Sequence, residues 1–493
     1  MRLHRRISRR LAVTATTTLT AIAVAGTAVG VYAGTGSGAA ETVAPVAAAA
    51  ALPLGYGKVT VGDRTFITDS AGRSLQLRGA NRGKYPGDRV SEADVKEMAA
   101  KGLNLLRLVV QWQYIEPQKG VYDQAYLDYI DRVLGYGDRH GVFVMIDMHQ
   151  DVFGPYFGGH NGMPAWATRD DGLPFEKDPD GNWFNDYFQP GVQAAFDHLY
   201  EDADLRQAQV AMWQKLARTA SPHPSLLGYD LFNEPMAKIK EGEDLPTASA
   251  RFEQGQLADM YRRLITGIRE VDRRSWIFVE PTVLVGEGVP TKLPAFDDAR
   301  IAYAPHFYDT SVESGQDWDP DGGFVQRYEA AITAYAKANR LPLVVGEWGP
   351  PTARTEGNRR LVARQMEAMN RFAVGEAVWY WCKGTGGYCA LDPSGAPAPG
   401  HEPAFAPYAR WIGGKLTAHS FNDSSRVFST AYTLPLTAVG TTEISLPDEV
   451  YPNGFDVAIE GLATKAWDGT KNILSVYATG IPGSRIKVTV TPR

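Results

Sequence analysis

Short apolar runs rich in Val, Ile and Leu recur along most of the chain, and longer amphipathic stretches separate them. Residues 105–110 and 142–148 are continuous runs of this kind. Such runs are typical of strands that are buried on both faces, as in a parallel barrel. The stretch at residues 126–140 has instead the 3.6-residue period of an amphipathic helix. The alternation predicts strands that are each followed by a helix.

Eight runs have the length and composition of barrel strands: residues 74–79, 105–110, 142–148, 226–232, 275–279, 300–304, 341–345 and 375–381. Helical patterns separate most of them, at residues 126–140, 192–217, 250–271, 323–339 and 358–373. Eight strand–helix units over about 330 residues predict an α/β fold, a (β/α)₈ TIM barrel with inserted loops. We expect residues 57–68 to form a hairpin that leads into the first strand.

The helical period disappears after the Ala/Pro-rich segment at residues 396–400. Short β-type runs between Gly, Pro and Asp turns follow, at residues 426–432, 443–446, 456–459, 472–477 and 485–490. They predict a C-terminal antiparallel β-sandwich domain. We therefore divide the chain into a signal and flexible spacer at residues 1–51, the barrel at residues 52–402 and the sandwich at residues 403–493.

The first residues have the pattern of a secretory signal. Five arginines stand in the first ten positions, an apolar run follows at residues 11–33, and the run ends in Val31-Tyr32-Ala33. This is the order of the charged, apolar and cleavage regions of a signal peptide. The run is nearly long enough to span a bilayer, so a retained membrane anchor is the alternative. We expect export with cleavage, which makes the protein secreted, and the exact cleavage site stays open.

Composition narrows the function. The formal net charge is −6, and the basic residues are dispersed beyond the leader, so the chain has no electrostatic footprint for nucleic acid. The two cysteines, Cys382 and Cys389, do not make up a zinc-site spacing, and we expect no metal and no cofactor. They could be free or bonded, and export favours a disulfide. The 11 Trp and 23 Tyr mainly suit core packing, although flat rings also suit sugar faces.

Polar and aromatic residues recur where the predicted strands end, which is where a barrel of this kind carries its chemistry. The candidates are Lys84, Arg107, His149, Asp151, Asn233, Glu234, His306, Tyr308, Glu347, Trp379 and Trp381. Each alone has a structural alternative, because Arg107 could belong to an ion pair and either histidine could be a packing residue. Their recurrence at nearly every strand end indicates a functional site.

Glu234 and Glu347 have the strongest local context, because they end the fourth and seventh predicted strands on opposite sides of the ring. Two carboxyl groups facing one bond are what glycosidic cleavage requires: one protonates the leaving oxygen and the other attacks carbon. Arg107 and Tyr308 could keep Glu347 ionised as the nucleophile. The nearby negative charge would raise the pKa of Glu234 and keep it protonated as the acid. Asn233 could bond the sugar's 2-hydroxyl.

Two segments carry a family resemblance. Asn233-Glu234-Pro235 and the Gly-Glu-Trp-Gly segment around Glu347 resemble the acid/base and nucleophile motifs of glycoside hydrolase family 5. The resemblance implies a retaining barrel enzyme with Glu234 as acid/base and Glu347 as nucleophile. It also places several candidates at the family's active-site positions: Arg107, His149, His306, Tyr308 and one of Trp379 or Trp381.

Residues 147–153 and 162–167 narrow the resemblance to the endoglycoceramidase branch, as do the long insertion before Trp213 and the tail from residue 408. Members of this branch cleave the bond between an intact glycan and ceramide. The resemblance implies that Lys84 and Asp151 contact the first sugars, that the partner is a glycolipid or oligosaccharide, and that membrane or micelle contact is transient. The glycan series, the first sugar and the role of the sandwich stay open. The oligomeric state also stays open, with a monomer favoured.

Two other functions compete with this one. A second enzyme class is a polysaccharide or simple glycoside hydrolase, such as a β-glucanase, mannanase or β-glucosidase, and residues 149–151 with the insertion argue against it. A non-catalytic carbohydrate-binding protein would require the barrel to have lost one carboxylate, and both Glu234 and Glu347 are present.

Overall fold

The computed structural model describes residues 57–85, 87–436 and 440–493, so the expected signal and spacer at residues 1–51 lie outside the described residues. Eight parallel strands form one sheet in the order β10-β11-β4-β5-β6-β7-β8-β9. The strands are β4 (Leu77–Arg82), β5 (Leu105–Val110), β6 (Phe143–Met148), β7 (Leu226–Asp230), β8 (Trp276–Val279), β9 (Ile301–Tyr303), β10 (Val344–Trp348) and β11 (Gly375–Val378).

Backbone hydrogen bonds close this sheet between its two outer strands, β9 and β10. The Tyr303 amide donates to the Pro342 carbonyl at 2.8 Å, and the Phe307 amide donates to the Glu347 carbonyl at 2.9 Å. These bonds leave the sheet without an open edge, so the predicted (β/α)₈ barrel is confirmed.

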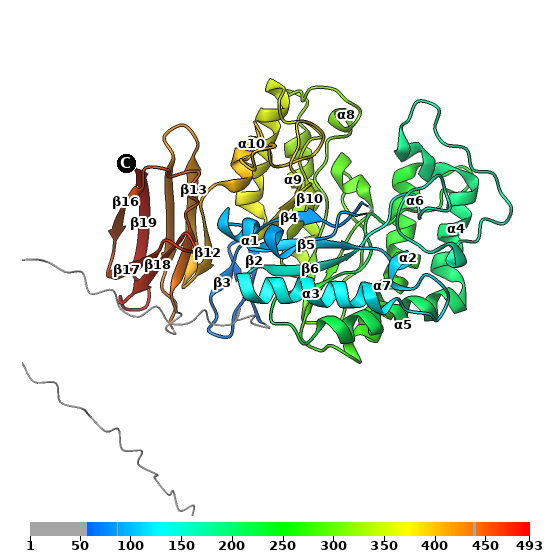
Figure 1. Cartoon of the computed structure of the whole chain (residues 1–493), viewed down its shortest axis with the longest axis horizontal. Coiled ribbons are helices and arrows are strands. Elements are labelled where there is room, and N and C mark those ends of the chain that lie inside the picture. The colour runs from blue at the N-terminus through cyan, green and yellow to red at the C-terminus, as the bar shows by residue number, and fades with distance from the viewer. Residues whose placement is uncertain (1–56, 86, 437–439) are drawn as a thin grey trace, which may run out of the picture. The chain divides into compact units, whose positions relative to one another are not determined.

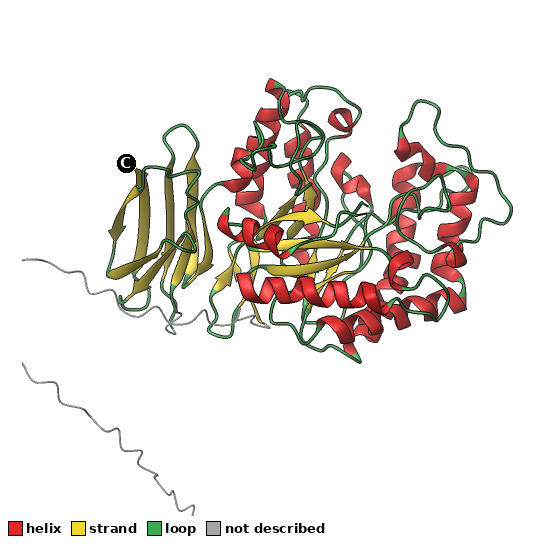
Figure 2. Cartoon of the chain, in the orientation of Figure 1, coloured by secondary structure: helices red, strands yellow, loops and turns green. Residues whose placement is uncertain are grey.

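Helices surround the barrel strands, as Figures 1 and 2 show. The α-helices are α1 (Glu92–Ala100), α2 (Trp112–Ile115), α3 (Gln124–His140), α4 (Pro190–Glu201), α5 (Ala203–Ala220), α6 (Leu245–Phe252), α7 (Ala258–Arg269), α8 (Thr310–Glu313), α9 (Phe324–Asn339) and α10 (Glu356–Phe372). The short helical turns are η1 (Ala165–Ala167), η2 (Trp183–Phe188), η3 (Glu253–Leu257, a π-helix), η4 (Val283–Glu287) and η5 (Glu402–Phe405). Within the described part of the chain, every helix is too short or too polar to cross a membrane.

The helix predicted at residues 192–217 is two helices, and that prediction is corrected. The chain leaves helical geometry at Asp202, where ψ is 125°, and α5 then begins at Ala203. The Asp202 carboxylate pairs with Arg169 and with His198 outside the helix backbone. Aspartate competes poorly for helix interiors because its side chain favours such local partners, so the break falls there.

The C-terminal strands form two antiparallel sheets, which confirms the predicted sandwich. One sheet has the order β1-β2-β3-β12-β15-β18-β17 and the other β13-β14-β19-β16. The C-terminal strands are β12 (Tyr408–Ile412), β13 (Lys415–Asn422), β14 (Val427–Thr433), β15 (Thr442–Ser445), β16 (Phe455–Glu460), β17 (Ala463–Asp468), β18 (Ile473–Ala478) and β19 (Arg485–Pro492). The N-terminal strands of the larger sheet are β1 (Gly57–Val61), β2 (Arg64–Thr68) and β3 (Ser74–Leu75).

The N-terminal hairpin therefore belongs to a sheet of the sandwich, and the first barrel strand begins later than predicted. Ser74 pairs with Thr68 of β2, and Leu75 pairs with Trp411 of β12. The chain crosses to the barrel at the next residue, since the Leu77 amide donates to a carbonyl beside β11. Residues 74–75 therefore do not belong to the barrel strand that was predicted at residues 74–79.

The first residues of several barrel strands share an apolar core with the sandwich. Leu77, Leu105 and Phe143 are buried there together with Trp411. The rings of Phe143 and Trp411 are 6.2 Å apart and nearly perpendicular. The sandwich thus covers the amino-terminal ends of the strands and leaves their carboxyl ends for the polar residues.

Candidate active site

The predicted polar residues converge at the carboxyl ends of the barrel strands, because parallel strands end at one edge of the sheet. Lys84 follows β4, Arg107 lies within β5, His149 and Asp151 follow β6, Asn233 and Glu234 follow β7, His306 and Tyr308 follow β9, Glu347 lies within β10, and Trp379 follows β11. Gly228 permits the close approach of β7 and β8 here, since a Cβ at this position would lie 2.0 Å from the Trp276 carbonyl oxygen.

Arg107 is the central cation of the site and is fully buried. Its guanidinium lies 2.9 Å from Asp230, 2.9 Å from Glu280, 2.9 Å from Asp147 and 2.5 Å from Glu347. A guanidinium has five N–H donors and stays charged in proteins, so it can hold four acids at once. Arg107 was predicted to bind substrate, but its side chain has no exposed surface, and its partners are the four carboxylates and the side-chain oxygens of Asn81 and Asn233.

Glu347 is held as an anion. One of its oxygens accepts from Arg107, and the other accepts from the Tyr308 hydroxyl at 3.1 Å. Burial alone would raise the pKa of Glu347, but the charges of His306, Arg107 and His149 outweigh that effect and lower it below its usual value. The carboxylate is therefore ionised near neutral pH.

Glu234 has the opposite electrostatics. Burial raises the pKa of Glu234, and the charges of Glu347 and Glu280 raise it further, against the hydrogen bond from His306 at 2.9 Å. Its backbone is in the left-handed region at φ 43°, an uncommon state for a residue with a side chain. The Glu234 amide donates to Glu280 at 2.8 Å, which fixes that conformation. Environment thus divides the two acids into a proton donor and an anion.

An oxygen of Glu234 and an oxygen of Glu347 lie within 4.8 Å of each other. Retaining glycosidases have carboxyl separations of about 5–5.5 Å and inverting ones about 6.5–9.5 Å.

Three clusters of side chains at this site, each of three residues, have the spacing of metal ligands. One cluster includes His149 and another includes His306. Neighbouring carboxylates raise the pKa of both histidines, that of His149 to about 9. In two of these clusters an imidazole faces carboxylates, and the acids of the third, Asp147, Asp230 and Glu280, surround the Arg107 guanidinium.

A second cluster flanks the carboxyl pair. The Lys84 ammonium lies 2.9 Å from Asp151 and 4.9 Å from the centre of the Trp379 ring. The His149 ring stacks on Trp379 at 5.6 Å and donates to Asp147 at 2.8 Å. An indole face beside charged hydrogen-bonding groups suits a sugar ring with its hydroxyls.

Trp381 does not join this cluster, which corrects its prediction as a binding residue. Its side chain is buried in the main apolar core, and its amide donates to the Asn81 carbonyl. In a strand, residues two positions apart face the same side, so the two tryptophans would be expected to point the same way. They lie beyond the end of β11 (Gly375–Val378), however, where that rule no longer applies.

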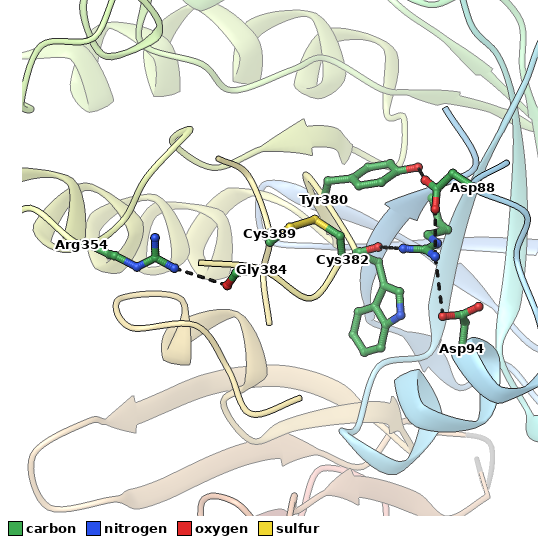
Figure 3. Close-up of a disulfide and its surroundings, with 9 residues drawn as sticks. Asp88, Asp94, Arg354, Tyr380, Cys382, Gly384 and Cys389 are labelled. Atoms are coloured by element: carbon green, nitrogen blue, oxygen red, sulfur yellow. Dashed lines mark hydrogen bonds and ion pairs between the residues drawn. A yellow bond between two sulfur atoms is a disulfide. The ribbon is translucent and has the colours of Figure 1, made fainter. Parts of the chain in front are cut away.

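Three acids of the site are not among the residues predicted from the sequence: Asp147, Asp230 and Glu280. Asp147 and Asp230 lie inside otherwise apolar strands, and Glu280 directly follows β8. A carboxylate in a strand that is buried on both faces needs a countercharge. Asp147 and Asp230 therefore indicated a buried cation near them, and Arg107 is that cation. The two cysteines are joined in a disulfide, Cys382–Cys389, in the loop after β11 (Figure 3).

A parallel barrel that carries one glutamate with a lowered pKa and one with a raised pKa across its mouth defines the class of barrel glycosidases. Comparison with known families agrees. The cellulase model of glycosyl hydrolase family 5 matches residues 68–385, and the glycoside hydrolase family 5 C-terminal domain matches residues 407–490. The chain belongs to glycoside hydrolase family 5 and is a glycosidase.

Three of the proteins that match most of this chain are an endoglycoceramidase I, an endo-glycoceramidase II and an endogalactoceramidase. Endoglycoceramidase I of Rhodococcus hoagii (strain 103S) is 25% identical over 447 residues, which cover 86% of this chain and 87% of the relative. The structure of endo-glycoceramidase II from Rhodococcus sp., in complex with ganglioside GM3, is 30% identical with a TM-score of 0.77 and covers 87% of this chain and 99% of that one. A crystal structure of endogalactoceramidase shares the fold at 24% identity, with a TM-score of 0.69 and coverage of 89% and 100%.

Proposed function

We propose that this glycosidase cleaves the β-glycosidic bond between glycan and ceramide in glycosphingolipids, with retention of configuration. One observation carries the proposal: the chain is 30% identical to endo-glycoceramidase II, whose structure is a complex with ganglioside GM3, and the likeness extends over 99% of that chain. The relative's substrate is assigned to this protein on that basis, and the carboxyl pair supplies the chemistry.

The proposed reaction has two displacements. In the first, the Glu347 carboxylate attacks the anomeric carbon while the bond to the ceramide oxygen breaks, and Glu234 gives its proton to that oxygen. In the second, Glu234 takes a proton from water, which attacks the same carbon and releases Glu347. Both steps are within carboxylate chemistry, so the proposed mechanism requires no cofactor.

Neighbouring residues have supporting roles in this proposal. Asn233 donates one amide hydrogen to the Gln150 carbonyl at 3.1 Å, and its second amide hydrogen can bind the sugar's 2-hydroxyl. Lys84, Asp151 and Trp379 form the surface for the first sugars. Arg107 acts on the reaction through Glu347, through the other buried carboxylates and through Asn233, whose side-chain oxygen accepts from it at 3.0 Å.

A lipid substrate also calls for apolar surface near the mouth. The segment between β6 and α4 exposes large apolar side chains: Tyr156 is 53% exposed, Leu173 43% and Trp183 44%. Aromatic rings of this kind suit the boundary between water and lipid. We propose that this segment makes transient contact with a membrane or micelle while the head group is bound.

A second candidate function is polysaccharide hydrolysis, as by a β-glucanase, mannanase or β-glucosidase. The observation that favours it is the cellulase description of the matching family model. One experiment separates the two: hydrolysis of a panel of gangliosides, glucosylceramide and galactosylceramide, measured beside soluble β-glucans and mannan. We expect release of intact glycan from a glycolipid. Activity on the soluble polysaccharides alone would overturn the lipid assignment.

We further propose that the protein is exported. The support is the order of charged, apolar and small residues before residue 34, together with the disulfide, which persists in oxidising compartments. The test is expression of the full chain followed by N-terminal sequencing of the protein in the medium. A mature protein that starts after the apolar run supports export, and an uncut cell-bound chain supports the anchor.

A further inference from the structure

The loop closed by the disulfide is fastened on both sides. The Tyr380 amide donates to the Tyr388 carbonyl at 2.9 Å, and the Leu391 amide donates to the Cys382 carbonyl at 3.1 Å. On its outer side, Arg354 donates to the Gly384 carbonyl at 3.4 Å (Figure 3). Tyr388 has the largest side chain of this loop, and it directly precedes Cys389 of the disulfide.

Tyr388 makes two side-chain contacts across the barrel mouth. Its hydroxyl donates to the carboxylate of Glu313, and its ring meets the ring of Tyr308 nearly edge-on at 6.4 Å. Glu313 is the last residue of α8, a single helical turn that is capped by Asp309. Since Tyr308 immediately precedes that cap, both contacts of Tyr388 act on the same short segment.

Tyr308 is the residue of that segment that contacts the carboxylate of Glu347. Its hydroxyl donates to Glu347 at 3.1 Å, to the oxygen that Arg107 does not hold. A hydrogen bond to a charged group is stronger than a neutral one, and it depends steeply on distance and angle. A small displacement of Tyr308 would therefore remove one of the two donors that orient this carboxylate.

We propose that Tyr388, held in place by the Cys382–Cys389 disulfide, is a positioning residue that fixes Tyr308 against Glu347, so that turnover depends on the redox state of this disulfide. The proposal rests on the nucleophile role proposed for Glu347. The sequence contains only these two cysteines, so a thiol reductant has a single target in the chain.

A double-mutant cycle tests the link from Tyr388 to Tyr308. The kinetics of wild type, Tyr388→Phe, Tyr308→Phe and the double variant are measured on an aryl β-glycoside that the wild type hydrolyses. We expect Tyr388→Phe to lower kcat about fivefold, with KM changed less than about twofold, because one hydrogen bond to a charged group is weakened. In the Tyr308→Phe background the same change should cost less than about twofold. Additive losses, or a change in KM alone, would overturn the proposal.

Reduction tests the role of the disulfide. Wild type and Tyr388→Phe are treated with dithiothreitol without denaturant, the two released thiols are titrated, and kcat is measured before and after reoxidation. We expect reduction to lower wild-type kcat by about the factor of the Tyr388→Phe change, reversibly, and to lower the variant less than about twofold. Full activity of the reduced wild type, or equal losses in both proteins, contradicts the proposal.

Two further comparisons complete the design. Glu313→Gln retains an acceptor for the Tyr388 hydroxyl, so it should keep more activity than Glu313→Ala, and equal losses would overturn the contact. Tyr229→Phe is the matched control, because Tyr229 also donates to a carboxylate, that of Asp272 at 2.8 Å, and its ring packs against Trp213 outside the site. The nucleophile is checked separately: if Glu347→Gln keeps its turnover, the proposed function fails. If that variant is inactive while the cycle is additive, only the positioning role fails.

Discussion

The two ends of the same barrel strands bury opposite kinds of side chain. Strand β6 begins with Phe143, which packs against the sandwich, and carries Asp147 near its other end. Strand β10 likewise begins with Val344 and carries Glu347 one residue before its end. Hydrophobic burial thus occupies the amino ends, while buried charge occupies the carboxyl ends.

The amino ends of the strands therefore stabilise the fold, while the carboxyl ends carry the catalytic groups. Each apolar side chain buried beside the sandwich contributes about 1.5–3 kcal/mol. The charges at the carboxyl ends gain little on balance, because their desolvation offsets their attraction. The barrel can therefore hold Glu234 in a left-handed backbone conformation with a raised pKa, because the other end of the strands supplies the stability.

The largest expected effect separates chemistry from stability at the carboxyl ends. Glu347→Gln removes the nucleophile while it keeps the shape of the side chain, so we expect kcat to fall about 10⁴-fold. The melting temperature should change by only a few degrees, because the amide oxygen can still accept from Arg107 and the amide NH2 can donate to the Tyr308 oxygen. Kinetics on an aryl glycoside and a thermal melt check both. Glu460→Gln in the exposed face of β16 is the control, and a rate that stays within tenfold of wild type contradicts the assignment.

Arg107 tests whether its charge keeps the acids of this end together. Arg107→Met leaves Asp147, Asp230, Glu280 and Glu347 without their shared cation, and a buried charge that loses its partner costs about 3–5 kcal/mol. We expect that loss in urea unfolding, together with loss of turnover because the pKa of Glu347 rises. Arg107→Lys keeps the charge, so its stability and its turnover should lie between those of wild type and Arg107→Met. A Met variant as stable as wild type would show that the acids are neutral without Arg107.

The sequence predicts the barrel well because strands buried on both faces are continuously apolar, and all eight were located. It predicts the sandwich less well: β12, β13 and β17 (Ala463–Asp468) are not among the predicted strands, and the side chains of β13 and β17 are mostly exposed and show no apolar run. The N-terminal hairpin was assigned to the barrel because the strand that links it to the sandwich, β3, pairs with β12 (Tyr408–Ile412), which is more than 300 positions away. The pattern of hydrophobic and polar residues within one segment does not specify which distant strand it pairs with.

The site follows the same division. Strand ends can be read from the pattern, so Glu234, Glu347 and the Lys84–Asp151 pair were predicted to lie at one edge. The role of Arg107 was not predicted in full, because its burial depends on four acids from four strands that meet only in three dimensions. The choice between Trp379 and Trp381 also required the structure, since both follow the same strand.

Trp411 tests the apolar end. Its ring packs on Phe143 and under the Arg73 guanidinium, which lies 4.9 Å from the ring centre. Trp411→Ala should lower the free energy of unfolding by about 3 kcal/mol, the lower part of the range for buried tryptophan. At a temperature where the variant stays folded, kcat should remain within about twofold of wild type. Trp467→Ala, at a position 42% exposed, is the matched control and should cost less than about 1 kcal/mol. A large loss of kcat in folded Trp411→Ala would mean that the two ends are coupled.

The smallest expected effect concerns Glu376, the one acid of β11, which lies one residue from the strand's apolar start. Burial raises its pKa to about 7, against the opposing influence of Arg78 and of the Trp348 indole, which donates to it at 2.6 Å. The folded protein therefore binds this proton more tightly than the unfolded chain does. Its contribution to stability is full below the unfolded pKa and is lost as the pH rises through about 7.

Glu376→Gln keeps an acceptor for the Trp348 indole and removes the ionisation. The variant should be more stable than wild type by about 1–3 kcal/mol at about pH 8 and by much less at about pH 5. Urea unfolding at the two pH values measures this difference, and Glu367→Gln at an exposed position of α10 should show no such dependence on pH. An equal change at both pH values would mean that Glu376 is charged throughout, and that the apolar end, like the carboxyl end, stabilises an anion.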